Sequence, residues 1–293
     1  MNSANKIAKL AKERSLWRDA LHRLLRDRLV VLGLILVGTA LICALFAAQI
    51  APYGPVDGDV STLYVKSPST AHPFGTDDIG RDVFSRVIYG AQISMRVAVF
   101  AEALGMVIGV SLGLIAGYYG GLAETAIMRV VDIFLAFPLL IIAVALVAAF
   151  GPSETSIFVS LSTLVWPTIT RVVRAQVLSV RETEYVLAAR SIGVSNAGIM
   201  FRHILPNILT PLIVYASLTL ADLILQEAAL SFLGLSAADR STPSWGKMLN
   251  DGRAYIRSAA WLIFFPGLAI FGTVLGFNLL GDGLREALDV RTR

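Results

Sequence analysis

The chain has 293 residues, of which 56% are hydrophobic and only 16% are charged. In soluble domains about a quarter of the residues are charged, so this composition excludes an ordinary soluble enzyme and indicates a membrane protein. The net charge of +4 is too small to favour nucleic acid as a partner, and the single cysteine, Cys43, excludes a disulfide framework within the chain. We expect an all-α polytopic fold with six transmembrane helices.

Residues 1–28 form a basic N-terminal segment. Eight Lys and Arg residues stand there against three acids, and apolar residues recur at helical spacing between Leu16 and Leu25. Basic amphipathic helices of this kind lie on the anionic inner leaflet, where we place this one. Residues 29–293 are the predicted transmembrane domain. Its first span, 29–50, lacks a small-residue cleavage pattern and is interpreted as an anchor.

A mostly polar loop, 51–92, separates the first two spans. Its second half belongs to the segment HPFGTDDIGRDVFSRVIYGAQIS at 72–94. His72 has no ligand-spaced partner, so we assign it no metal. We predict that the charged residues of this segment form an ion-pair network that orients the following helix: Asp77, Asp78, Arg81, Asp82 and Arg86.

The second predicted span, 97–118, has a glycine at every fourth position. The four glycines are Gly105, Gly109, Gly113 and Gly117. This spacing makes one smooth helical face, where another helix backbone can approach closely. Glu102 lies in the same span, and it must face protein or water because lipid does not solvate a carboxylate.

The remaining spans are predicted at 130–150, 157–173, 208–233 and 259–280. An inner loop, 119–129, precedes the third span, in which Pro138 is expected to kink the helix. The fourth span is expected to continue as a helix past Arg171 and Arg174 toward the inner side. Four acids fall within these membrane segments, and we expect them either to line a pathway or to pair between helices: Glu102, Asp132, Asp222 and Glu227.

Residues 181–207, RETEYVLAARSIGVSNAGIMFRHILPN, are a polar island between two apolar spans. Apolar and small residues from Tyr185 to Ile192 repeat at helical spacing, and Gly193 is placed to end that helix. Ser195 or Asn196 can cap a second helix, which we expect to break at Pro206. The arginines of this region favour the inner side of the membrane. The pattern indicates a helical hairpin that docks onto another protein.

The hairpin resembles the "EAA loop" of ABC-importer permeases in the spacing of Ala188-Ala189, Gly193 and Leu205-Pro206. Two positions differ from the family pattern, because Leu187 stands where the family has glutamate and His203 stands where it has isoleucine. Three more segments resemble the peptide and nickel branch of that family: FGTDDIGRDVFSR at 74–86, TPSWGKML at 242–249 and LGDGLREALD at 280–289. The resemblance covers nearly the whole chain from residue 29.

The resemblance implies the permease subunit of an ATP-driven importer for di- or oligopeptides, with nickel or another small solute as the alternative. It implies a second homologous permease, two cytoplasmic ATPase subunits and an extracytoplasmic binding protein as partners. ATP and Mg²⁺ belong to the ATPases, and the chain itself is expected to bind no cofactor or metal and to hold no catalytic group. The implied location is a bacterial or archaeal cytoplasmic (inner) membrane, with both termini inside.

The residues that the resemblance places against an ATPase are Tyr185, Ala188, Ala189, Arg190, Ile192, Gly193, Leu205 and Pro206. We also expect the glycine face of the second span to contact the partner permease.

Two other classes of protein are alternatives for this sequence. An ion-coupled secondary transporter would use the buried acids as proton sites and would need no hairpin. An intramembrane aspartyl protease would use Asp132 and Asp282, but Asp282 lies at the water-exposed edge of the last span. The chain has no G-x-x-x-x-G-K-[ST] phosphate-binding loop and no G-x-S-x-G nucleophile elbow.

Overall fold

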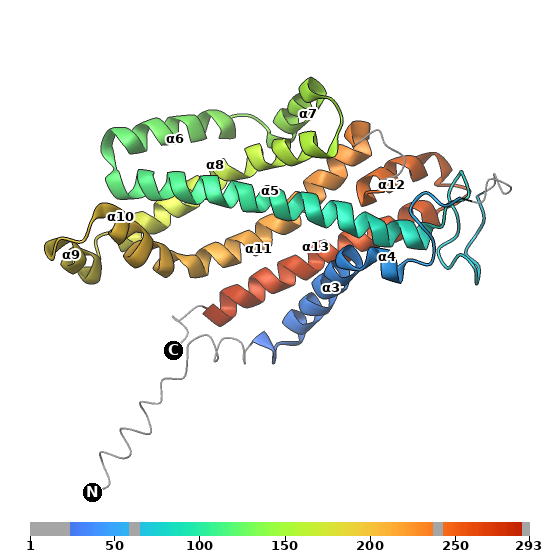
Figure 1. The fold of residues 1–293 in the computed structure, drawn as a ribbon, viewed down its shortest axis with the longest axis horizontal. Helices are drawn as coiled ribbons and strands as arrows, with labels where there is room; N and C mark the ends of the chain where they lie inside the picture. The colour runs from blue at the N-terminus through green and yellow to red at the C-terminus, as the bar shows by residue number, and fades with distance from the viewer. Residues whose placement is uncertain (1–23, 59–64, 237–242, 289–293) are drawn as a thin grey trace, which may run out of the picture.

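The computed structural model describes residues 24–58, 65–236 and 243–288 (Figure 1). Within them the elements are helical, with two isolated β-bridges in the loops. Five helices are long and apolar enough to cross a membrane, and six spans result if one sharply bent pair counts as a span. The all-α polytopic fold is therefore confirmed. Nearly all of the basic N-terminal segment lies outside the described residues.

The first span is a pair of helices, α3 (Arg28–Leu45) and α4 (Ala47–Ile50), separated at Phe46. Asp27 caps α3 by accepting a hydrogen bond from the Leu29 amide at 2.8 Å. The helix packs on the last helix, α13 (Trp261–Leu288), where a Cβ added to Gly33 would lie 2.9 Å from the Gly276 carbonyl oxygen. Glycine therefore permits this close contact between the two backbones.

The second helix, α5 (Val83–Tyr119), begins 14 residues before the predicted start at Val97. The Asp82 carboxylate caps it, accepting from the Ser85 amide at 2.7 Å. At 1.5 Å per residue, its 37 residues extend about 55 Å, well beyond a ~30 Å hydrocarbon core. The polar first turns, which sequence patterning assigns to a loop, thus belong to a helix that is too long to lie wholly within the hydrocarbon core.

The predicted inner loop at 119–129 is wrong, because α6 (Gly121–Leu135) starts directly after α5. Gly120 and Gly121 have φ angles of +68° and +54°, a left-handed conformation that lets the chain reverse in two residues. The helix α7 (Leu139–Phe150) follows at an angle of 84° to α6. The expected kink at Pro138 is confirmed, but it divides the third span into two helices.

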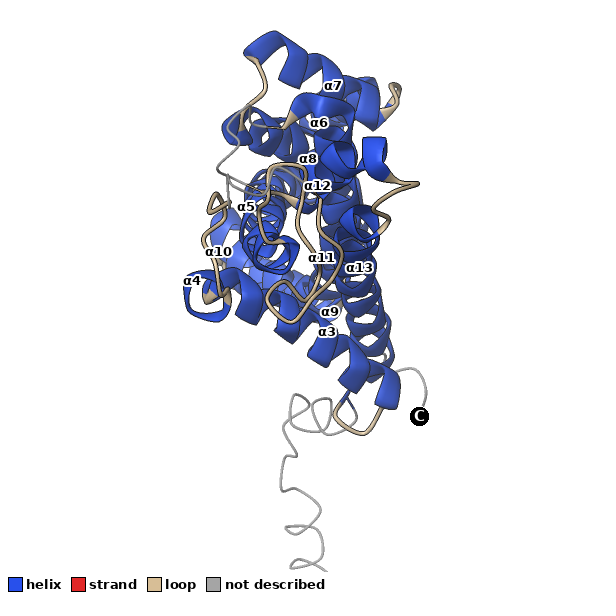
Figure 2. Cartoon of the chain, turned by 90° about the vertical axis from the view of Figure 1, so that its right-hand side faces the viewer, coloured by secondary structure: helices blue, strands red, loops and turns tan. Residues whose placement is uncertain are grey.

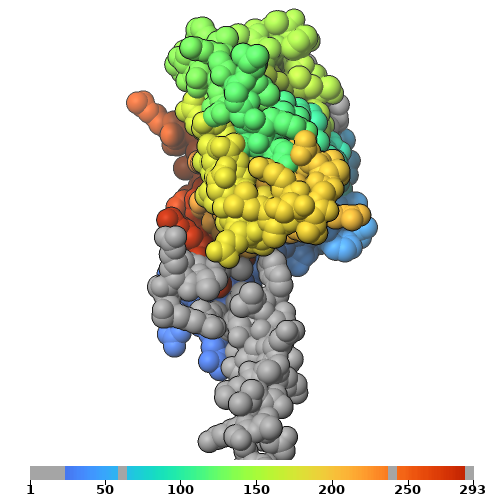
Figure 3. Space-filling model, turned by 90° about the vertical axis from the view of Figure 1, so that its left-hand side faces the viewer, coloured from blue at the N-terminus to red at the C-terminus, as the bar shows by residue number. Residues whose placement is uncertain are grey.

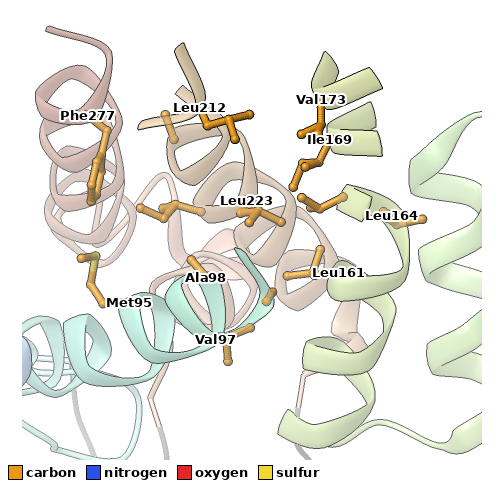
Figure 4. Close-up of a cluster of buried hydrophobic side chains, with 14 of the residues drawn as sticks. Met95, Val97, Ala98, Leu161, Leu164, Ile169, Val173, Leu212, Leu223 and Phe277 are labelled. Atoms are coloured by element: carbon orange, nitrogen blue, oxygen red, sulfur yellow. The ribbon is translucent and has the colours of Figure 1, made fainter. Parts of the chain in front are cut away.

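The core of the bundle lies between α5, α13, α8 (Glu154–Val180) and α11 (Leu205–Leu230) (Figure 4). As predicted, α8 continues as a helix beyond Arg174. The α5 glycines lie against four β-branched or aliphatic residues of α8: Val165, Ile169, Val173 and Val177. The glycine face is therefore covered within the chain, and the expectation that it contacts a partner permease is wrong.

The two ends of the bundle differ in construction. At one end, the loop of residues 65–82 gathers with α12 (Trp245–Gly252), η2 (Ser231–Leu235) and η3 (Arg253–Tyr255) (Figure 2). At the other end, α9 (Glu184–Ser191), α10 (Asn196–Gly198) and η1 (Ile199–Ile204) project from the bundle (Figure 1).

Candidate functional site

The projecting hairpin turns at Gly193. Its φ of +83° ends α9, and the Val194 amide donates to the Ala189 carbonyl at 3.1 Å. The Ser195 hydroxyl then accepts from the Gly198 amide at 3.2 Å and caps α10. A Cβ at Gly193 would meet nothing within 4 Å, so the requirement for glycine comes from backbone conformation alone.

One face of the hairpin is buried against the bundle. Val186, Ile199 and Ile204 are fully buried, and Ala189 is only 4% exposed. Ala189 therefore cannot lie on a surface that enters an ATPase groove, and this part of the predicted contact is wrong. Its small side chain lies on the buried side of α9, which packs mainly against η1.

The rest of the hairpin is exposed at this end of the molecule (Figure 3), with large apolar residues among polar ones. Ile192 is 80% exposed, and Ala188, Arg190 and Gly193 are also exposed. Leu187 and Phe201 are exposed apolar residues of the hairpin as well, and sequence patterning did not assign either of them to the contact. Leu187 was identified only as a departure from the family pattern, which has glutamate there. We call the exposed large apolar residues of the hairpin the hairpin surface: Tyr185, Leu187, Ile192 and Phe201. Tyr185 and Leu187 project from different sides of α9, because residues two positions apart do not share a helix face.

The second helix of the hairpin does not break at Pro206. The chain stays helical from Asn196 to the kink at Gly234, and Pro206 lies in the first turn of α11. The π-helical segment η1 directly precedes it, with the Leu205 amide donating to Met200 instead of to residue 201. This wider turn accommodates the proline ring, which would otherwise collide with the carbonyl one α-helical turn earlier. Leu205 is half-buried, whereas Pro206 is exposed.

Polar contacts fasten the hairpin to the bundle. The Tyr118 hydroxyl donates to Asn196 Oδ1 at 2.9 Å, and the Arg190 guanidinium lies 5.6 Å from the Tyr118 ring centroid. Arg181 Nη1 donates to the Gly117 carbonyl at 2.8 Å. The hairpin is therefore attached to the C-terminal end of α5 as well as to α11.

Two of the four membrane carboxylates are satisfied by neighbours. Asp132 pairs with Arg171 at 2.6 Å, joining α6 to α8. Glu227 is 1% exposed and accepts hydrogen bonds from Ser94 and Ser231, each at 2.8 Å. These contacts give both residues a role in packing helices together.

The other two membrane carboxylates, Glu102 and Asp222, have no such partners among the described residues. Glu102 is 5% exposed, and neither of its oxygens has a hydrogen-bond partner among the described residues. Asp222 is exposed on α11, without a hydrogen bond or ion pair to any described residue. Within the described residues, no three His, Cys, Asp or Glu side chains are grouped so that they could hold a metal ion.

The charged network predicted at 77–86 is present in part, at the far end of the bundle. Asp77 pairs with Arg81 at 2.7 Å and lies 3.5 Å from Arg86. Asp82 instead contacts His72 at 3.0 Å while it caps α5. Asp78 forms no ion pair within the described residues and lines the neighbouring cleft, so three of the five predicted residues pair with one another.

A cleft of about 480 Å³ lies beside this network, between the loop and α12. It is lined by charged and polar side chains, including Asp78, Lys247 and Asn250. Asp251 also lines it, and burial raises the pKa of this carboxyl, with Arg86 and Lys247 opposing the change.

The long apolar helices define a polytopic membrane protein with a projecting helical hairpin. Residues 109–293 match the model of the binding-protein-dependent transport system inner membrane component, and residues 15–68 match the N-terminal transmembrane domain of oligopeptide transport permease C. The chain belongs to this family of ABC-importer permeases, within its peptide-permease branch. It is a multi-pass inner-membrane subunit without catalytic function, which excludes the protease hypothesis.

Curated relatives match along nearly their whole length. The chain is 44% identical to the dipeptide transport system permease protein DppC of Alkalihalophilus pseudofirmus, covering 94% of this chain and 90% of the relative. It is 40% identical to the glutathione transport system permease protein GsiD of Pectobacterium atrosepticum, covering 96% and 93%. It is 38% identical to the oligopeptide transport system permease protein OppC of Bacillus subtilis, covering 99% and 94%.

A solved structure has a similar fold. The MetNI methionine ABC transporter, solved in inward-facing conformations, contains a chain that superposes with a TM-score of 0.56. The match has 21% sequence identity and covers 69% of this chain and 96% of the other. Membership of a binding-protein-dependent family implies ATPase and binding-protein partners for this chain.

Proposed function

We propose that this chain is one half of a heterodimeric permease that imports peptides across the inner membrane. A binding protein delivers the peptide on the outer side, and two ATPase subunits, which hold ATP and Mg²⁺, drive the cycle from the inner side. The relatives named for dipeptide, oligopeptide and glutathione transport support peptides as the substrate class.

The observation that carries the proposal is the hairpin surface. Four large apolar side chains are exposed on a short, capped hairpin that projects beyond the bundle. Exposed apolar surface with a rigid, buried underside is typical of a protein contact. We assign this surface to an ATPase, with Tyr185, Ala188, Arg190 and Ile192 as contacts and with Gly193 fixing the turn.

Transport follows from rigid-body motion. ATP binding brings the two ATPases together, and each carries the hairpin that is docked on it. The hairpin is continuous with α11 and attached to α5, so its displacement tilts these helices. The tilt closes the pathway on one side of the membrane and opens it on the other. Leu205 and Pro206 transmit the motion as part of that continuous helix, and they need not touch the ATPase.

The test uses the complex of this chain with its second permease, ATPases and binding protein in proteoliposomes. Uptake of radiolabelled dialanine, glutathione and nickel is measured with and without ATP and binding protein. We expect peptide uptake that requires both additions. Uptake of nickel without uptake of either peptide would show that nickel is the substrate. Peptide uptake driven by an ion gradient without ATP would favour the secondary-transporter hypothesis instead.

A further inference from the structure

The polar cleft at the end of the bundle opposite the hairpin has one wall made by the short helix α12. Lys247, Asn250 and Asp251 all line the cleft, and their spacing of three and four residues places them on one face of that helix. Trp245 and Met248 lie on the other face and are only 2% and 6% exposed. The helix therefore packs its apolar side on the bundle and presents its polar side to the cleft.

The position of α12 is fixed by contacts with two long helices. The Trp245 indole donates to the Val87 carbonyl of α5 at 2.9 Å. A Cβ on Gly246 would lie 2.4 Å from the Ala228 carbonyl oxygen of α11, so the two backbones are in close contact there. A polar face that is held in this way keeps its side chains in a defined place.

The facing wall is a loop whose backbone is held by the Asp77 carboxylate. This carboxylate accepts from the amides of Ile79 and Arg81 at 3.1 and 2.9 Å, and from Arg81 Nε at 2.7 Å. Gly80 turns the chain between them with a φ of +80°. Asp78 and Arg81 thereby line the cleft. Because both walls are fixed by contacts within the chain, the cleft is formed before any ligand enters it.

The cleft carries charges of both signs. Asp78 and Asp251 are exposed acids, and Arg81 and Lys247 contribute positive charge. Its volume of about 480 Å³ falls within the range of about 300–1,000 Å³ that is usual for small-molecule sites. A ligand of one sign would be repelled by some of these groups, whereas a ligand with both signs meets an opposite charge at each end.

A short peptide with free ends has this distribution of charge. Its α-amino group has a pKa of about 7.7–8 and its α-carboxyl group one of about 3.3–3.7, so most molecules are charged at both ends at neutral pH. The cleft lies between a loop and a helix that are outside the candidate membrane spans, so a peptide reaches it from water.

Building on the proposed peptide import, we propose that this cleft is a receiving site for a short peptide with free ends, on the outer side of the permease. Asp78 and Asp251 bind the ammonium end, and Lys247 and Arg81 attract the carboxylate end. Gly234, where the helical run of α11 and η2 ends, also lines the cleft. The site therefore adjoins the helix that continues to the hairpin.

A crosslinking experiment tests whether a peptide enters the cleft. The membrane complex is reconstituted without the binding protein, with photoreactive benzoylphenylalanine in place of Ala254, which lines the cleft. Radiolabelled dialanine should crosslink on illumination. Unlabelled dialanine should compete, whereas N-acetyl-dialanine amide, which lacks both charges, should not. Benzoylphenylalanine in place of Ile256 is the matched control and should give no crosslink, because Ile256 is 59% exposed nearby but does not line the cleft.

Charge variants then test which groups hold the two ends of the peptide. Asp78→Asn combined with Asp251→Asn should lower the yield of the Ala254 crosslink at least about tenfold, since hydrogen bonds to charged groups are the strong ones. Lys247→Gln should have an effect of the same size. Arg253→Gln is the control, because it removes an exposed positive charge that does not line the cleft, and it should leave the yield unchanged.

Two results would overturn the receiving site and leave the proposed function standing. One is the absence of a crosslink from position 254 in a complex that imports dialanine. The other is a normal crosslink in the charge variants together with ATP hydrolysis that no longer responds to the binding protein, because the cleft would then be a socket for that protein. Failure of the wild-type complex to import any peptide, measured separately, would refute the proposed function itself.

Discussion

Gly109 and Ile169 lie so close that a Cβ on the glycine would come within 2.6 Å of the isoleucine Cβ. The same relationship is repeated one helical turn away in each direction along α5 and α8. The two helices therefore form one unit whose packing depends on the absence of side chains.

This contact predicts the effect of Gly109→Leu. Overpacking a close helix contact costs about 1–3 kcal/mol, so the variant should unfold at a lower temperature in detergent even when this subunit is purified alone. Gly38→Leu is the control, because a Cβ at Gly38 meets nothing within 4 Å. Equal melting temperatures for the two variants would show that α5 and α8 do not pack in this way.

The hairpin surface can be tested at Ile192. Ile192→Asp places a charge in a contact that should exclude water, so the ATPases should dissociate during purification and uptake should be lost, while the second permease is retained. Leu122→Asp is the control, since Leu122 is 90% exposed at the start of α6, outside the hairpin. Ala189→Asp should behave differently, because it buries a charge beneath the hairpin and should lower the yield of folded subunit. ATPase retention by Ile192→Asp at wild-type level would remove the hairpin surface from the docking model.

The hydrogen bonds to the buried Glu227 carboxylate predict that removing one donor lowers the stability of the subunit. Ser94→Ala removes one of the donors to a fully buried carboxylate, and leaving such a group less satisfied costs about 1–3 kcal/mol. The thermal midpoint should therefore fall. Ser111→Ala on the same helix is the control, because Ser111 is exposed and bonds only to its own helix at Val107. An unchanged midpoint for Ser94→Ala would indicate that this junction carries little of the folding free energy.

Membrane orientation is a further prediction. The concentration of basic residues near the hairpin and at both chain ends places all three on the cytoplasmic side. In a Cys43→Ala background, a cysteine at Ala197 should react only after the membrane is permeabilised, whereas one at Ser258 should react from outside. The reverse labelling pattern would invert the proposed topology.

Sequence patterning located the apolar spans well, because hydropathy directly reports burial in lipid. It misplaced the start of α5, since Ser85, Arg86 and Gln92 resemble loop residues. Their helix is stabilised by the Asp82 cap and by contacts from residues far along the chain, such as Trp245, whose indole donates to the Val87 carbonyl at 2.9 Å. Such long-range contacts leave no periodic signal in the local sequence.

In the candidate sites, too, local features could be predicted from the sequence and features that depend on distant contacts could not. Gly193 was predictable because a single residue must adopt a left-handed conformation, and its φ of +83° agrees. The sequence did not predict that Leu187 is exposed and Ala189 is buried. A short helix with small and apolar residues on several sides can pack on its neighbours in more than one rotation about its axis. Likewise, the sequence placed four acids in the membrane, but only their neighbours separated the satisfied pair from Glu102 and Asp222.

The position of Gly234 has a mechanical consequence. The helical run that begins in the hairpin continues through α11 to η2, and its regular backbone ends at Gly234, where φ is +84°. Gly234 also lines the polar cleft at the opposite end of the bundle. We therefore expect a displacement of the hairpin to travel along α11 and to be absorbed at this kink. The same stroke that answers ATP at one end would then change the shape of the cleft at the other.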